Sequence, residues 1–100
     1  MGIGLAIIHG HSMIPSYAPG EVVLVKYGAP VNVGDAVLIN FTHRTDIKRV
    51  KEILGNRVFV QGDHEAVSID SRNYGPVKDN MIIGKVIYRF PRWLRIGRKN

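Results

Sequence analysis

The sequence predicts a small, mostly β fold arranged as one folded sheet or barrel. Two observations support this prediction. Short apolar runs and period-2 alternation recur between glycine and proline residues, while nowhere do apolar residues keep a 3.6-residue period for three turns. The chain has 100 residues, which is enough for one compact core and too few for two. We therefore expect a single β-rich domain over residues 1–94, followed by a basic tail over residues 95–100.

Six strands are expected, over residues 5–8, 22–27, 36–41, 46–53, 57–61 and 82–89. The breaks between them fall at turn-forming pairs such as Pro19-Gly20 and Gly34-Asp35. Gly55-Asn56 separates two β-rich runs and predicts a tight hairpin. Residues 62–77 are polar and far more numerous than a hairpin requires. Long loops in compact domains often carry function, so this one is expected to contribute to a site.

Composition excludes several classes of site and leaves the compartment open. The chain has no cysteine, which excludes disulfides, a thiolate nucleophile and a thiolate zinc site. No apolar run approaches the roughly 20 residues of a membrane span, and residues 2–8 are interpreted as a first strand instead of a signal peptide. The net charge is +6, and every charged residue after Asp79 is basic, which predicts an anionic partner: Lys85, Arg89, Arg92, Arg95, Arg98 and Lys99.

Ser12 is the candidate nucleophile because it lies between a flexible and a rigid residue. Gly10 can adopt backbone angles closed to other residues, and Pro15 fixes its own φ, so a constrained turn is expected to present the hydroxyl. A serine in a turn usually bonds only to its own backbone. A catalytic role therefore requires a base elsewhere in the chain.

Lys48 is the candidate base. It stands beside Arg49 in a β-rich run, and strict alternation places the two side chains on opposite sides of the strand. Arginine is almost never deprotonated, whereas lysine loses its proton readily when it is buried among apolar groups. A neutral lysine can take the proton of a serine hydroxyl, which gives a Ser/Lys dyad. On spacing alone, two exposed basic residues on a surface strand remain the alternative.

Four segments, in order, resemble the motifs of the signal peptidase I family of serine endopeptidases. The nucleophile motif is similar to residues 10–15, Gly-His-Ser-Met-Ile-Pro, followed by Pro19-Gly20-Glu21. The second, a Gly-Asp pair opening a strand, is similar to Gly34-Asp35, and the lysine motif to Lys48-Arg49-Val50. The late motif is similar to residues 62–64 and 68–75, Gly-Asp-His and Ser-Ile-Asp-Ser-Arg-Asn-Tyr-Gly. The resemblance spans residues 10 to about 89.

The resemblance implies a β fold of the type shared by signal peptidase and LexA, with a role for each matched residue. Ser12 would be the nucleophile that forms an acyl-enzyme and Lys48 the general base. Ser68 would orient the lysine, and an ion pair of Asp70 with Arg72 would hold the late loop. Met13 and the preceding turn would shape the substrate pocket. No cofactor or metal is implied, and the partner would be an extended precursor peptide carrying a signal peptide or a propeptide.

The chain departs from the family pattern at some positions. Gly10 stands where some members carry a serine that completes the oxyanion hole, so the Ser12 backbone N–H and a second, unidentified donor would stabilise the oxyanion. Residues 25–35 are similar to the short proteases that remove the propeptide of nickel-type superoxide dismutase. The two resemblances imply different locations: a signal peptidase would be membrane-associated, whereas a propeptide maturation protease of the short, anchorless kind would be cytoplasmic.

Other readings of the sequence remain open. A LexA-like self-cleaving peptidase would also use serine and lysine, but this chain has no helix-turn-helix pattern. A non-catalytic β-module could bind an acidic partner or a membrane surface through the basic, aromatic C-terminal tail, whereas nucleic acid is a weaker expectation. His9 and His11 would share one strand face, but no third metal ligand is near them in the sequence.

Overall fold

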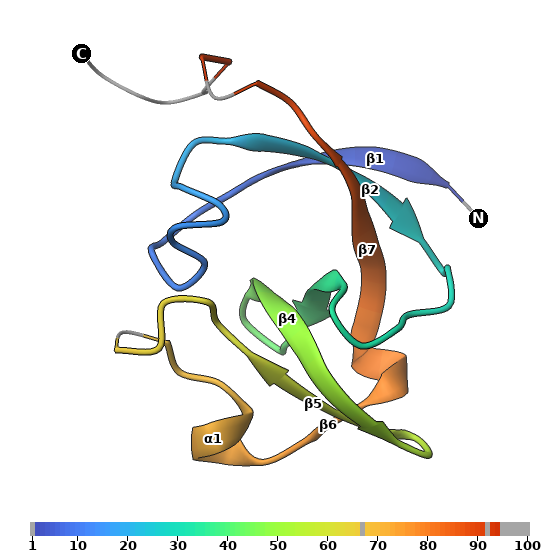
Figure 1. Cartoon of the computed structure of the whole chain (residues 1–100). Helices are drawn as coiled ribbons and strands as arrows, with labels where there is room; N and C mark the ends of the chain where they lie inside the picture. Colours follow the sequence, from blue (N-terminus) through green and yellow to red (C-terminus); the bar gives the residue numbers. More distant parts are fainter. Residues whose placement is uncertain (1, 67, 92, 95–100) are drawn as a thin grey trace.

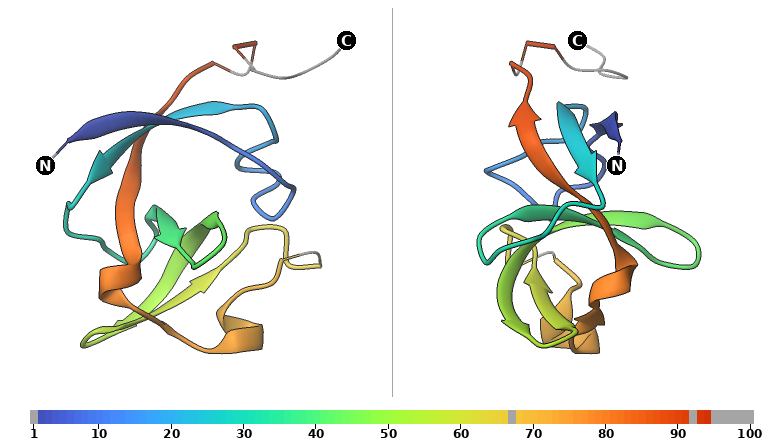
Figure 2. Two further views of the ribbon diagram at one scale, coloured as in Figure 1. Left: turned by 180° about the vertical axis from the view of Figure 1, so that it is seen from behind. Right: turned by 90° about the vertical axis from the view of Figure 1, so that its right-hand side faces the viewer.

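The chain forms one curled, antiparallel sheet that closes about half of a barrel (Figures 1 and 2). A computed structural model describes residues 2–66, 68–91 and 93–94, so the predicted tail over residues 95–100 lies outside the described residues. Its strands are β1 (Ile3–Ile7), β2 (Val22–Tyr27), β3 (Ala36–Asn40), β4 (Thr45–Leu54), β5 (Arg57–Gln61), β6 (Val77–Lys78) and β7 (Ile82–Arg89). Their order across the sheet is β1-β2-β7-β3-β4-β5-β6.

The mostly β fold is confirmed, and all six expected strands are present, three with the predicted bounds. Strands β1, β3 and β4 differ from the prediction by one or two residues at their ends. Three short elements were not expected: β6, the helix α1 (Ser71–Tyr74) and the 3₁₀ helix η1 (Asp79–Met81). Each has four residues or fewer, which is too short for a periodic pattern to appear in the sequence.

The core consists of two apolar clusters on the two faces of β3. Alternation along this strand sends Ala36 and Leu38 to one face and Val37 and Ile39 to the other, and all four side chains are buried. The first cluster holds Ile8, Met13, Val23, Val25, Ala36, Leu38 and Ile47; the second holds Val37, Ile39, Val50, Val58, Val60 and Val77. A strand buried on both faces reads as a continuous apolar run, as residues 36–39 do.

The two clusters fix the strands that carry the candidate site. The turn that carries Ser12 follows β1, and its Met13 side chain, 1% exposed, is part of the first cluster. Strand β4 has Ile47 in the first cluster and Val50 in the second. The backbone of Lys48 lies between these two buried residues, so packing on either side of it along the strand fixes its position. Burial of each such apolar side chain contributes on the order of 1.5–3 kcal/mol.

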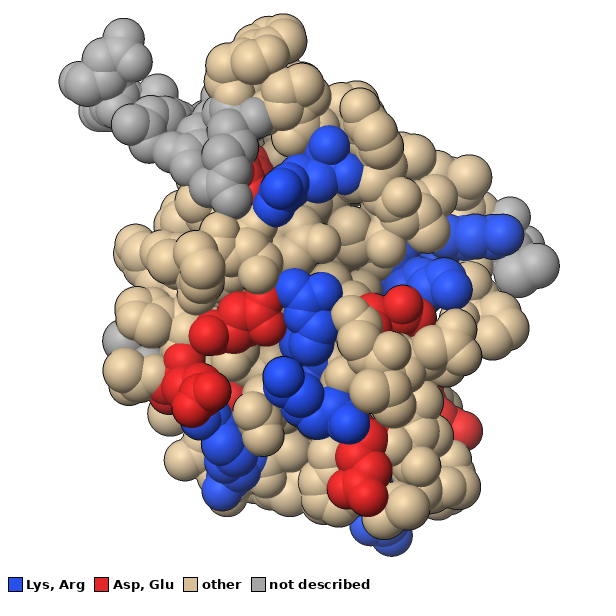
Figure 3. All heavy atoms as spheres, viewed as in Figure 1, with Lys and Arg blue, Asp and Glu red and all other residues tan. Residues whose placement is uncertain are grey.

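Charged side chains of both signs lie next to one another over much of the face drawn in Figure 3. Three of the ion pairs among the described residues have N–O distances below 3 Å: Arg44–Asp46, Arg49–Asp63 and Arg72–Asp70. Among the described residues, no helix is long and apolar enough to cross a membrane.

Candidate active site

The turn that carries Ser12 is held by backbone hydrogen bonds and by the core. Gly10 has a φ of 77°, a left-handed conformation that favours glycine, and it redirects the chain after β1. The Ile14 N–H donates to the His11 carbonyl at 3.2 Å, and the Tyr17 N–H donates to the Met13 carbonyl at 2.8 Å. With the buried Met13 as an anchor, the turn presents Ser12 from a fixed backbone.

The late loop between β5 and α1 lies directly against this turn. The His64 N–H donates to the Ser12 carbonyl oxygen at 2.8 Å, and the His64 ring contacts the His11 carbonyl. Gly62 is the point of closest approach: a Cβ atom there would lie 2.5 Å from the Ser12 carbonyl oxygen and would overlap the Ser68 hydroxyl. Only glycine fits between the Ser12 turn and Ser68.

Lys48 is buried, with a relative exposure of 3%, and its Nζ donates to the Ser68 hydroxyl at 3.1 Å. Burial lowers the pKa of this lysine, and the positive charges of Arg44 and Arg72 act in the same direction. The carboxylates of Asp46 and Asp70 oppose the shift and do not reverse it. Lys48 therefore loses its proton at a lower pH than a solvent-exposed lysine does.

Ser68 is the centre of a saturated hydrogen-bond network. Its hydroxyl accepts from Lys48 Nζ and from the Gly62 N–H, both at 3.1 Å, and donates to Asp70 Oδ2 at 2.6 Å. A hydroxyl has one proton, so Ser68 cannot also donate to the lysine. The lone pair of a neutral Lys48 is therefore left available for another proton donor.

Asp70 anchors this network from a fully buried position. Arg72 Nε and Nη2 each donate to its carboxylate at 2.9 Å, and the Gly62 N–H donates to Oδ2 at 2.8 Å. Burial alone would raise the pKa of Asp70, but the hydrogen bonds from Arg72, Ser68 and Gly62 together lower it well below the usual value. Asp70 also caps α1, in a capping box with Asn73.

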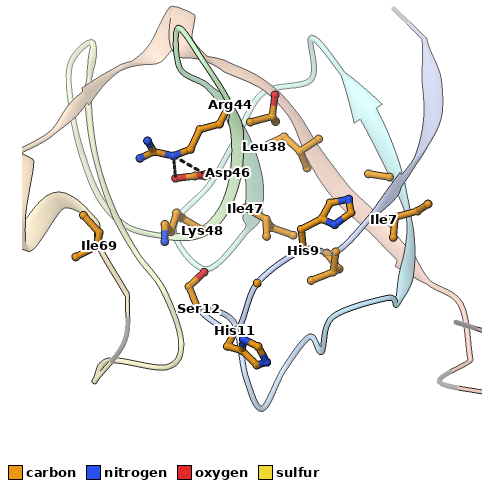
Figure 4. A pocket seen from close by; sticks show the side chains of 14 residues that line it. Ile7, His9, His11, Ser12, Leu38, Arg44, Asp46, Ile47, Lys48 and Ile69 are labelled. Atoms are coloured by element: carbon orange, nitrogen blue, oxygen red, sulfur yellow. Dashed lines mark hydrogen bonds and ion pairs between the residues drawn. The ribbon is translucent and has the colours of Figure 1, made fainter. Parts of the chain in front are cut away.

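Ser12 and Lys48 line one groove of about 910 Å³, together with residues of β1, β3, β4 and the two loops. Figure 4 shows the Ser12 hydroxyl and the Lys48 amine pointing toward one another across this groove. Among the described residues no hydrogen bond joins the two groups, which is common before substrate binds. The lining residues are Ala6, Ile7, Ile8, His9, Gly10, His11, Ser12, Leu38, Arg44, Thr45, Asp46, Ile47, Lys48 and Ile69.

Most of the residues singled out in the sequence come together here. Ser12 and Lys48 share the groove, and Ser68, Asp70 and Arg72 connect to Lys48 through hydrogen bonds. Met13 was expected to shape the substrate pocket. Its side chain is buried in the first core cluster and is not among the groove-lining residues, whereas the preceding residues 9–12 line the groove; its role in shaping the pocket stays a prediction.

Sequence reasoning gave no role to three residues at the site. Gly62 was noted only as part of a motif, although it fixes the approach of the late loop. Arg44 and Asp46 line the groove as an ion pair and were not considered as site residues; the opposite charges two residues apart, just before and within β4, were the available signal. Among the described residues, no group of three His, Asp or Glu side chains could hold a metal ion.

Comparison with known proteins gives the family. The family model for signal peptidase, peptidase S26, matches residues 51–93. A mitochondrial ATP-independent inner membrane protease subunit 1b from Arabidopsis thaliana is 34% identical, over 85% of this chain and 68% of its own length. Mitochondrial inner membrane protease subunit 2 from Schizosaccharomyces pombe is 27% identical, over 96% of this chain and 69% of its own length. With its β fold and its sequence relatives in agreement, this chain belongs to the signal peptidase S26 family, and family membership supports a peptidase-type function.

Proposed function

We propose that this chain is a serine endopeptidase that removes a signal peptide or a propeptide from a precursor protein, with Ser12 as nucleophile and Lys48 as general base. The observation that carries the proposal is the buried Lys48, whose pKa is lowered by burial, in the same groove as Ser12. A lysine that loses its proton readily is the group that activation of a serine hydroxyl requires.

The reaction has two steps. In the first, the neutral Lys48 amine takes the Ser12 proton while the Ser12 oxygen attacks the carbonyl carbon; the peptide C–N bond then breaks, and the proton passes from Lys48 to the departing amine. In the second, Lys48 takes a proton from water, the resulting hydroxide attacks the ester, and Ser12 regains its hydrogen as the acid product leaves. Ser68 keeps Lys48 in position throughout, because its own proton is directed to Asp70.

The substrate is proposed to bind as an extended strand. Two stretches of backbone beside the groove favour this mode. Strand β1 is at the end of the sheet and, within the described part of the chain, pairs only with β2. Among the described residues, β5 pairs with β4 only from Arg49 onward, so the edge of residues 45–48 that faces away from β3 carries no strand partner. Unpaired strand edges accept an extended peptide through backbone hydrogen bonds.

A membrane surface is proposed as a second partner. Apolar side chains are exposed on β1, near the end of β7 and in the segment after it, with relative exposures of 63% for Leu5, 53% for Tyr88 and 82% for Trp93. Aromatic and basic residues together suit the headgroup region. Co-sedimentation with anionic vesicles checks this: a Trp93→Ala variant should bind less than wild type, whereas equal binding by the two proteins contradicts it.

Peptide cleavage tests the proposed activity. Wild type, Ser12→Ala and Lys48→Ala are each mixed with one peptide that carries a small-x-small signal-peptide site and one that carries a superoxide dismutase propeptide junction. We expect cleavage by wild type alone, and the preferred peptide identifies the type of precursor. Cleavage of neither peptide by folded wild type, or undiminished cleavage by either variant, contradicts the proposal and favours the non-catalytic β-module.

A further inference from the structure

His64 contacts both carbonyl groups that flank the Ser12 Cα atom, and the proposed chemistry gives it no role. Its N–H donates to the Ser12 carbonyl oxygen at 2.8 Å, and its ring Nδ1 lies 3.3 Å from the His11 carbonyl oxygen. A carbonyl oxygen can only accept, so the second contact is a hydrogen bond when Nδ1 carries a proton. One half-buried residue therefore holds the two peptide planes on either side of Ser12.

His64 is also fixed to the side of the groove that carries the base. The Ser68 N–H donates to the His64 carbonyl oxygen at 3.1 Å, and the Ser68 hydroxyl accepts from Lys48 Nζ at 3.1 Å. Hydrogen bonds thus run from the Ser12 backbone through His64 and Ser68 to Lys48. Figure 1 shows the late loop lying against the turn that follows β1. His64 therefore sets the position of the Ser12 backbone relative to Lys48.

The bond to the His11 carbonyl also sets the direction of the Ser12 N–H. The two groups belong to one planar, trans peptide unit, so they point in opposite directions. The Ile14 N–H donates to the same carbonyl at 3.2 Å, so this oxygen accepts from two sides. Among the described residues, the Ser12 N–H donates to no acceptor, which leaves it available to a ligand. A fixed, unused donor beside a nucleophile suits the oxyanion of an acyl transfer.

We propose that His64 is a positioning residue for oxyanion stabilisation: through its hydrogen bonds to His11 and Ser12, it holds the Ser12 N–H in the orientation that stabilises the negative oxygen formed when Ser12 attacks the peptide carbonyl. The inference rests on the proposed function. The oxyanion forms only after the peptide has bound, so loss of the His64 ring should lower kcat and leave KM unchanged. Removal of an oxyanion donor costs roughly 100- to 1000-fold in kcat, and loss of the bond that orients it should cost less, about tenfold.

Two substitutions separate the hydrogen bond from the shape of the side chain. The amide nitrogen of asparagine is as many bonds from Cβ as Nδ1 of histidine, so His64→Asn can still donate to the His11 carbonyl. Leucine has nearly the shape of asparagine and no donor. The His64 N–H is present in both variants, so its bond to the Ser12 carbonyl is kept. His43→Ala, which removes an exposed histidine that does not line the groove, is the matched control.

Steady-state kinetics on a cleaved peptide give kcat and KM for each protein at the pH of its highest kcat. His64→Leu should lower kcat about tenfold with KM within about twofold of wild type, whereas His64→Asn and His43→Ala should keep kcat within about threefold. Melting temperatures establish that each variant is folded. Three results overturn the inference and leave the peptidase proposal intact: an unchanged kcat in His64→Leu, an equal loss in His64→Asn and His64→Leu, or an effect on KM alone.

The order of the Ser12 backbone gives a readout that needs no cleavage. ¹⁵N relaxation measures the order parameter of the Ser12 N–H, which is about 0.85 for a rigid backbone and below about 0.6 for a flexible one. The value should be near the rigid limit in wild type and His64→Asn and lower in His64→Leu. If wild type cleaves no peptide, the proposed function fails, and this measurement still decides the positioning role. A lower value in His64→Leu alone supports that role, and equal values in wild type and His64→Leu overturn it.

Discussion

Replacing Gly62 with alanine places a methyl group between the turn that carries Ser12 and the Ser68 side chain, which accepts a hydrogen bond from Lys48. The added Cβ would lie 2.5 Å from the Ser12 carbonyl oxygen, 2.6 Å from Ser68 Cβ and closer still to the Ser68 hydroxyl. Ordinary contacts begin at 3.4 Å, so the turn and the late loop must separate by roughly 1 Å. A misplacement of that size near a reacting centre costs on the order of 100-fold in rate.

The same substitution also overpacks a filled site, which costs about 1–3 kcal/mol in the free energy of unfolding. For a domain of this size, each kcal/mol lowers the melting temperature by about 4–8 °C. The assay is therefore kcat/KM for a cleaved peptide at a temperature where the circular dichroism of the variant is native. Gly2→Ala is the control, because a Cβ at Gly2 has no atom within 4 Å. If the kcat/KM of Gly62→Ala stays within about threefold of the wild-type value, the close approach at Gly62 does not position Ser12 relative to Lys48.

Three further predictions concern the ionisable groups of the site. Lys48→Met should abolish cleavage. It should also raise the free energy of unfolding at neutral pH, because folding lowers the pKa of this lysine and so makes its charged form costly. This increase in stability should vanish as the pH rises toward 10.5, where the unfolded lysine also loses its proton; urea unfolding at several pH values measures it. Asp46→Asn removes an anion that holds the proton on Lys48, so the acid limb of kcat/KM should move to lower pH; an unmoved limb contradicts this. Folding lowers the pKa of Asp70, so its carboxylate stabilises the fold at any pH above the ordinary pKa of 3.8. The free energy of unfolding of wild type should therefore fall below about pH 4. Asp70→Asn should be less stable than wild type at pH 7, and its stability should change less between about pH 4 and lower pH.

The strands and the motif residues were predictable because local patterns specify them. Alternation between turn residues marks β2, β5 and β7 with their correct ends. Alternation also places Lys48 and Arg49 on opposite sides of β4 but does not say which side is buried. That outcome depends on tertiary partners: Arg49 bonds Asp63 at 2.6 Å, while Lys48 is enclosed with Ser68.

Other parts of the site depend on contacts between distant segments and leave no local signal. Gly62 is needed because two loops meet there, and Met13 is buried because the turn folds back on the first core cluster. The i, i+2 spacing of Arg44 and Asp46 is visible in the sequence. The sequence does not show that the neighbouring edge of β4 lacks a strand partner. That edge is open because β5 pairs with β4 only from Arg49 onward among the described residues.

Covalent labelling tests the central claim, activation of Ser12 by Lys48, most directly. A peptidyl fluorophosphonate reacts with an activated serine and forms a stable phosphonyl ester with loss of fluoride, and intact mass followed by peptide mapping locates the adduct. The account predicts one adduct, on Ser12, with a labelling rate that falls at least about 100-fold in Lys48→Ala and is lost in Ser12→Ala. Absence of labelling in folded wild type, an adduct on another residue, or an equal rate in Lys48→Ala would contradict it.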